Sequence, residues 1–138
     1  MGDLWYENVL VNIDQHPLRL YILDWEFART GLPGSEIGLF CAYLNFFGQG
    51  NQAASVVLQS FLRAYSGISY RDIHLAQDTL AHWGLTYIFW APRDPPGDRE
   101  LVQDFVRRGV EFLVHSRDKA FLEKSPVRGL LPTGMVDL

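Results

Sequence analysis

The feature that most constrains the fold is a pair of short strand patterns followed by a long stretch of helical periodicity. Residues 8–14 and 19–25 are rich in β-branched, aromatic and aliphatic side chains, and turn formers occupy 14–17. This pattern predicts a β-hairpin with strands at about 9–13 and 20–24. Because both runs are apolar on both faces, we expect the hairpin to be covered on both sides. A single hairpin is too small to be a domain core.

Four segments with apolar residues at helical spacing follow the hairpin and must supply most of the core. The pattern predicts helices over 36–47, 52–66, 70–90 and 98–115. The predicted fold class is therefore mainly α with a small β-hairpin, an α+β arrangement.

Cap residues set the expected helix boundaries. Ser35 and Ser69 precede the first and third segments and fit as N-caps, and Asp72 stands three residues into the third. Asp98 fits as the N-cap of the fourth helix, and Gly67 is expected to end the second.

Length and composition indicate one globular domain. The chain has 138 residues, of which 48% are hydrophobic and 20% charged. We expect a single domain over 1–138, with a catalytic and metal-binding segment at 1–28, a helical part at 35–125 and an irregular tail at 126–138. The single cysteine, Cys41, lies on an apolar helical face and predicts a buried, unreactive thiol.

Charge and hydropathy exclude several classes of partner. A net charge of −4 argues against a dedicated nucleic-acid binder. No run of 18 uncharged apolar residues exists, so no membrane partner is expected. The first residues lack the basic start and apolar stretch of a secretory signal, and we expect a cytoplasmic protein.

Four polar residues near the hairpin carry the functional pattern. Asp3 and Asn8 have the spacing D-x-x-x-x-N, and Asp24 and Glu26 follow the second strand. Phosphoryl transfer needs an acid that accepts the proton of the attacking hydroxyl, and an amide and a carboxylate that hold magnesium. A hairpin would bring Asn8 and Asp24 to the same open end. The structural alternative is that Asp3 and Asn8 are turn or cap residues.

The order of these motifs resembles the aminoglycoside phosphotransferase and choline kinase family. Gly2-Asp3-x-x-x-x-Asn8, a hairpin and then Asp24-Trp25-Glu26 are similar to the family pattern H-G-D-x-x-x-x-N followed by I-D-W-E. The resemblance implies the carboxy-terminal lobe of a protein-kinase-like fold. It also implies an enzyme that uses ATP and Mg²⁺ to phosphorylate a hydroxyl group of a small molecule.

The resemblance also implies a role for each site residue. Asp3 would be the catalytic base, Asn8 and Asp24 the metal ligands, and Glu26 an auxiliary ligand. Glu36, in a loop region that also contains glycine and proline, would support the catalytic loop. Trp25 and Phe27 are expected to be core residues rather than substrate contacts.

Two departures from the family pattern shape the expected activity. Met1 stands at the position of the family's histidine, and the only lysines, Lys119 and Lys124, lie far downstream. We therefore expect the family's amino-terminal lobe to be absent and this chain alone to transfer phosphate slowly or not at all. The alternative function is a non-catalytic relative that acts as a binding or regulatory module. Leu4, Trp5 and the hairpin should then expose an apolar edge, or pair it with the missing lobe or another chain.

Overall fold

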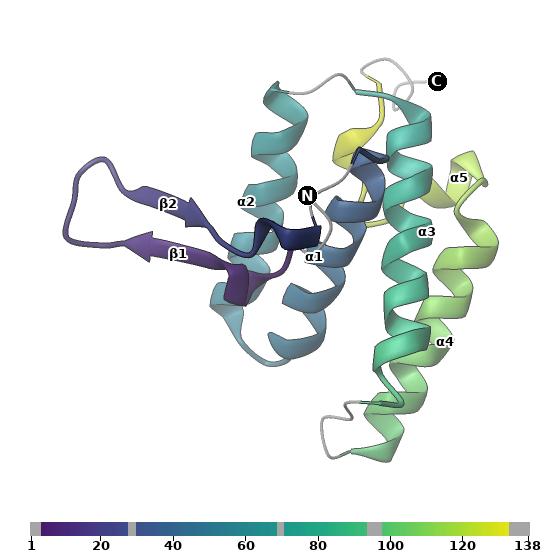
Figure 1. Cartoon of the computed structure of the whole chain (residues 1–138). Helices are drawn as coiled ribbons and strands as arrows, with labels where there is room; N and C mark the ends of the chain where they lie inside the picture. The colour runs from purple at the N-terminus through teal and green to yellow at the C-terminus, as the bar shows by residue number, and fades with distance from the viewer. Residues whose placement is uncertain (1–3, 28–29, 69–70, 94–97, 133–138) are drawn as a thin grey trace.

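A two-stranded hairpin projects from a bundle of helices (Figure 1). The structure is a computed structural model of the chain that describes residues 4–27, 30–68, 71–93 and 98–132. Its elements are η1 Tyr6–Asn8, β1 Val9–Asn12, β2 Arg19–Ile22, η2 Trp25–Phe27, α1 Pro33–Phe47, α2 Gln52–Ile68, α3 Ile73–Trp90, α4 Arg99–His115, α5 Lys119–Leu122 and η3 Arg128–Leu130. The predicted α+β class is confirmed.

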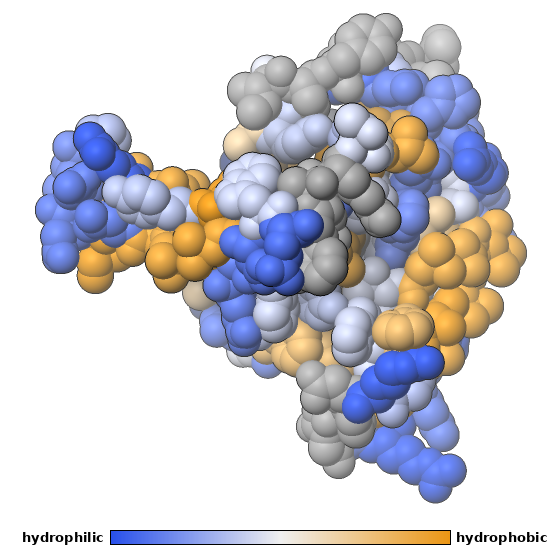
Figure 2. All heavy atoms as spheres, in the orientation of Figure 1, coloured by the Kyte–Doolittle hydropathy of each residue, from blue (hydrophilic) through white to orange (hydrophobic). Residues whose placement is uncertain are grey.

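The hairpin forms where the sequence predicts it, but its side chains are exposed rather than covered by the helices. Val9 pairs with Ile22 and Asn12 with Arg19 in an antiparallel register. Ile13 is 73% exposed and Leu20 is 65% exposed, and every residue of β2 is exposed. Figure 2 shows apolar side chains along this projecting arm. The expectation that the hairpin is covered on both sides is therefore wrong for the described residues, because the helices bury their apolar faces against one another.

The helices pack closely because glycines line their contacts. A Cβ atom added at Gly38 of α1 would lie 2.5 Å from the carbonyl oxygen of Thr79 in α3. On the other side of α3, a Cβ added at Gly84 would lie 2.5 Å from the carbonyl oxygen of Gly109 in α4. α3 is thus the central helix of the bundle, and its Trp83 is 2% exposed.

Two predicted helix starts are wrong and one is confirmed. α1 begins at Pro33, whose fixed φ suits the first helical position, and Ser35 lies inside its first turn, with its hydroxyl donating to the carbonyl of Leu32. Asp72, not Ser69, caps α3, because its carboxylate accepts from the backbone N–H of His74 at 3.1 Å. Ser69 lies outside the described residues. Asp98 caps α4 as predicted.

The end of α2 and the segment after α4 also differ in detail from the sequence pattern. α2 continues through Gly67 to Ile68, so this glycine does not end the helix. After α5, Val127, Leu130 and Leu131 are at most 2% exposed and join the core, although the chain there forms only a 3-10 turn. No helix in the described part of the chain has the length and apolar character needed to cross a membrane.

Candidate active site

The base of the hairpin brings Asn8 and Asp24 together along the backbone. The ladder continues past the Val9–Ile22 pair, because the backbone N–H of Leu23 donates to the carbonyl of Asn8 at 2.8 Å. Asp24 follows directly, so both predicted metal ligands lie at the same end of the hairpin. Asn8 is 8% exposed, whereas Asp24 is exposed. That the two side chains share one metal ion stays a prediction.

The backbone of Asp24 is in the left-handed conformation. Its φ is +59°, and no other non-glycine residue in the described ranges has a positive φ. This conformation costs an L-residue about 1–2 kcal/mol, and aspartate and asparagine adopt it most readily after glycine. The indole N–H of Trp25 donates to the carbonyl of Ile22 at 2.8 Å and closes the turn around Asp24. Such strained residues concentrate at functional sites.

The residues that follow Asp24 lie in the short helix η2. Glu26 is exposed and stands two residues from Asp24, on the surface where it can face a ligand. Trp25 is 57% exposed. The expectation that Trp25 is a core residue is wrong, because the hairpin and η2 project beyond the helices. The side chain of Phe27 lies outside the described part of the structure.

Glu36 connects the first turn of α1 to the start of the described chain. Its Oε2 accepts from the backbone N–H of Leu4 at 3.3 Å, across 32 positions of sequence. Leu4 follows Asp3 directly, so this hydrogen bond fixes the backbone beside the predicted base. Asp3 itself lies outside the described residues. The position of Glu36 in the first helical turn also stabilises its negative charge.

The donor set of Asn8, Asp24 and Glu26 fits a magnesium ion that is bound together with a nucleotide. Amide and carboxylate oxygens are the hard ligands that Mg²⁺ prefers. Mg²⁺ usually takes one or two carboxylates from a protein and completes its shell with waters and substrate phosphates. In the described part of the chain, no three or more His, Cys, Asp or Glu side chains are grouped to hold a metal ion. The site is thus unlike an all-protein metal cage.

A cavity of about 710 Å³ includes Ile22 and Trp25 in its lining, but not Asn8, Asp24 or Glu26. It runs between η2, the loop before α1, and the face of α2. It is lined by Leu4, Ile22, Trp25, Thr30, Gly31, Leu32, Pro33, Ser35, Glu36, Ile37, Phe61, Tyr65 and His82. Its volume is within the range of pockets that bind small molecules.

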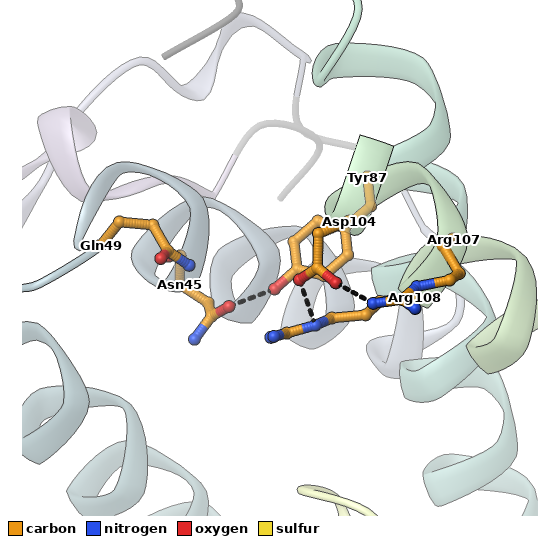
Figure 3. A network of polar contacts seen from close by, with 6 residues as sticks. All are labelled: Asn45, Gln49, Tyr87, Asp104, Arg107 and Arg108. Carbon is orange, nitrogen blue, oxygen red and sulfur yellow. Dashed lines mark hydrogen bonds and ion pairs between the residues drawn. The ribbon is translucent and has the colours of Figure 1, made fainter. Parts of the chain in front are cut away.

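Figure 3 shows a second group of polar residues, on α1, α3 and α4, which the sequence did not indicate. The Tyr87 hydroxyl donates to Oδ1 of Asn45, and the carboxylate of Asp104 pairs with Arg107 and with Arg108, the latter at 2.7 Å. Burial raises the pKa of Tyr87. The one sequence signal was a tyrosine on an otherwise apolar helix face, since a buried hydroxyl requires a partner.

This cluster lies away from the hairpin site. Asn45 is nine residues along α1 from Glu36, which is about 13 Å of helix. The arginines of the cluster are paired with Asp104. The Tyr87–Asn45 hydrogen bond therefore links α3 to α1, whereas the ion pairs of Asp104 lie within α4.

Two known proteins are similar to this chain over most of its length. Both are named 4-hydroxytryptamine kinase. The one from Psilocybe cubensis is 31% identical over 117 residues, and the one from Psilocybe cyanescens is 29% identical over 117 residues. Each alignment covers 80% of this chain and 32% of the relative, so the chain spans about a third of the length of these relatives. The similarity supports a relationship to kinases that act on small molecules.

No model of a known protein family matches the chain, and no solved structure matches it. The narrower assignment to the aminoglycoside phosphotransferase and choline kinase type is therefore a proposal.

Proposed function

We propose that this chain is the carboxy-terminal lobe of a small-molecule kinase of the aminoglycoside phosphotransferase and choline kinase type. The observation that carries the proposal is Asp24, held at a φ of +59° next to Asn8 at the base of the hairpin. This turn keeps an exposed aspartate at the same end of the hairpin as a buried amide, and both side chains carry oxygen atoms of the kind that Mg²⁺ binds. Similarity to two kinases supports the same reading.

The reaction follows from the roles of the residues. The oxygen of the acceptor hydroxyl attacks the γ-phosphorus of ATP, the bond from that phosphorus to the bridging oxygen breaks, and ADP leaves. Asp3 orients the hydroxyl and accepts its proton. Asn8 and Asp24, with Glu26 as an auxiliary ligand, would hold Mg²⁺, which neutralises charge on the phosphate oxygens. The remaining contribution of the protein is positioning.

Glu36 is the positioning residue of this site. Its carboxylate holds the N–H of Leu4 and thereby the backbone that carries Asp3. Because α1 packs against the core through Ile37, 2% exposed, and through glycine contacts with α3, the carboxylate stands on a rigid element. A rigid support keeps a catalytic group within the small tolerance that transfer requires.

The metal site can be tested without any measurement of activity. We would add Mn²⁺ in place of Mg²⁺, with ADP, and follow paramagnetic broadening of the backbone amides of Leu23 and Trp25 by NMR. Broadening is expected in the native chain and should disappear in Asp24→Ala. Asp14→Ala is the matched control, because Asp14 is an exposed carboxylate in the turn at the other end of the same hairpin. Equal broadening in both variants would contradict the metal assignment.

Transfer itself is tested by ADP release with ATP, Mg²⁺ and a panel of hydroxyl compounds. 4-Hydroxytryptamine is the first acceptor to try, because the two similar proteins are named for it. Turnover that is lost in Asp3→Asn supports the kinase. A chain that binds the metal with nucleotide but gives no turnover, even when expressed as part of a polypeptide as long as its relatives, supports the alternative of a binding or regulatory module.

A further inference from the structure

The cavity beside Glu36 has two aromatic walls, one on η2 and one on α2. One is Trp25 of η2, whose ring is 57% exposed although its N–H is already bonded to the carbonyl of Ile22. The other consists of Phe61 and Tyr65, one turn apart on α2, with ring centroids 6.1 Å from each other. A ring with no polar requirement left and an exposed face favours stacking against another planar group.

The aromatic wall on α2 is fixed by the core. The ring of Phe61 lies 4.6 Å, centroid to centroid, from that of Phe40 in α1. Phe40 is 8% exposed and belongs to the main hydrophobic cluster. Phe61 therefore packs against the core and also lines the cavity. A wall that does not need to be ordered upon binding keeps the entropic cost of binding low.

The ionisable groups of the cavity lining are one carboxylate, Glu36, together with His82 and the phenol of Tyr65. Among the lining residues that the structure describes, Glu36 is the only acidic residue, and none is lysine or arginine. The hydrogen bond from Leu4 occupies Oε2, and a carboxylate has about four lone-pair sites, so it can accept a further donor. A carboxylate beside aromatic faces favours an ammonium group and disfavours phosphate or carboxylate groups.

We infer that this cavity is the acceptor subsite, and that it takes a planar aromatic alcohol that carries an ammonium group. Phe61 and Tyr65 of α2 determine the specificity for the ring, and Glu36 receives the cation. That the bound hydroxyl is phosphorylated rests on the proposed function, whereas binding of the aromatic ammonium compound does not. It places a specificity element on a helix that contributes nothing to the phosphate-transfer residues.

Binding without ATP tests the subsite directly. The probes are tyramine, which has ring, hydroxyl and ammonium, 4-ethylphenol, which lacks the ammonium, and ethanolamine, which lacks the ring. Isothermal titration calorimetry measures the dissociation constant of each probe. We expect tyramine to bind about tenfold more tightly than either of the others, because 4-ethylphenol cannot contact Glu36 through an ammonium group and ethanolamine cannot stack on the aromatic side chains. Ethanolamine or 4-ethylphenol binding as tightly as tyramine would overturn the assignment.

Variants of the aromatic wall locate the binding site. Tyr65→Leu and Phe61→Leu should each weaken tyramine binding about fivefold or more, whereas Tyr65→Phe retains the ring and should keep most of the affinity. Phe89→Leu is the matched control, because Phe89 is a half-exposed aromatic of α3 outside the cavity. Circular dichroism of each variant separates lost binding from lost folding, and Trp25→Leu replaces any variant that fails to fold.

The outcomes distinguish this inference from the proposed function. Tyramine binding that depends on Phe61 and Tyr65, with no phosphate transfer even when the chain is part of a polypeptide as long as its relatives, leaves the subsite standing and overturns the kinase. Phosphate transfer to an aromatic alcohol, with affinities unchanged in the Tyr65→Leu and Phe61→Leu variants, leaves the kinase standing and overturns the subsite.

Discussion

At the scale of single residues, Asp24 combines an unfavourable backbone conformation with an exposed carboxylate. Its φ of +59° is one that glycine adopts without steric cost and alanine adopts with difficulty. A residue selected only for stability at this position would be glycine. The proposed function gives a reason for aspartate at this position, because its carboxylate would hold the metal ion.

The strain at Asp24 predicts that two substitutions there differ in stability although both lose function. Asp24→Gly should be more stable than Asp24→Ala by about 1 kcal/mol, since only glycine relieves the left-handed backbone. Both variants should lose metal binding and phosphate transfer. Urea denaturation midpoints of the two variants measure the difference. Equal midpoints would mean that residue 24 does not require this conformation.

At Glu36, by contrast, we expect the two substitutions to differ according to whether they keep an acceptor for the Leu4 N–H. Glu36→Ala removes the acceptor for the Leu4 N–H and should cost about 1 kcal/mol of stability, together with most of the phosphate transfer. Glu36→Gln keeps an oxygen acceptor for that N–H and should retain most of the stability. Thermal unfolding and turnover of the two variants test this, and a Gln variant as unstable as the Ala variant would contradict the hydrogen-bond role.

At the scale of elements, the contact of α3 with α4 depends on two facing glycines. Each backbone occupies the space where the other residue's Cβ would be, with 2.5 Å from the Cβ position of Gly84 to the Gly109 carbonyl oxygen and 2.7 Å in the reverse direction. Neither neighbour is a flexible side-chain end, so the helices must separate if a methyl group is added.

Gly84→Ala should therefore destabilise the fold by about 1–3 kcal/mol, although alanine favours helix. Gly67→Ala is the control, because Gly67 is also helical but has nothing within 4 Å of its Cβ position. That substitution should stabilise the chain by about 0.5–1 kcal/mol. Denaturant unfolding of both variants measures the contrast, and a neutral Gly84→Ala would show that the helices are not in close contact there.

At the scale of the whole molecule, the bundle and the projecting hairpin have different surfaces. The helices bury Trp83, Tyr87 and Phe105 almost completely, while the hairpin leaves large aliphatic side chains in solvent (Figure 2). An exposed apolar surface of this kind is typical of a region that contacts another surface.

We expect Ile13→Lys combined with Leu20→Lys to change the free energy of unfolding by less than about 0.5 kcal/mol, because both side chains are already exposed. The double variant should bind less of the dye ANS and associate less in sedimentation velocity. A large loss of stability would indicate that the two side chains are buried in the native protein.

The sequence by itself determined the elements whose causes are local. Residue type, strand length and turn residues were sufficient for the hairpin, helical spacing for the long helices, and Asp98 for the start of α4, since these depend on neighbours within a few positions. The spacing of Asn8, the hairpin and Asp24 was also sufficient to predict that these two residues lie at the same end of the hairpin, because an antiparallel pair fixes which ends coincide.

Only the tertiary structure decided which apolar residues are buried and which residues meet across the chain. Trp25 and the hairpin look like core residues in sequence but are exposed, whereas Val127 and Leu131 come from an irregular segment but are buried. The Leu4–Glu36 hydrogen bond and the Phe61 wall of the cavity join residues far apart in sequence. Burial and such contacts depend on how whole helices pack, and no periodicity within a single segment contains that information.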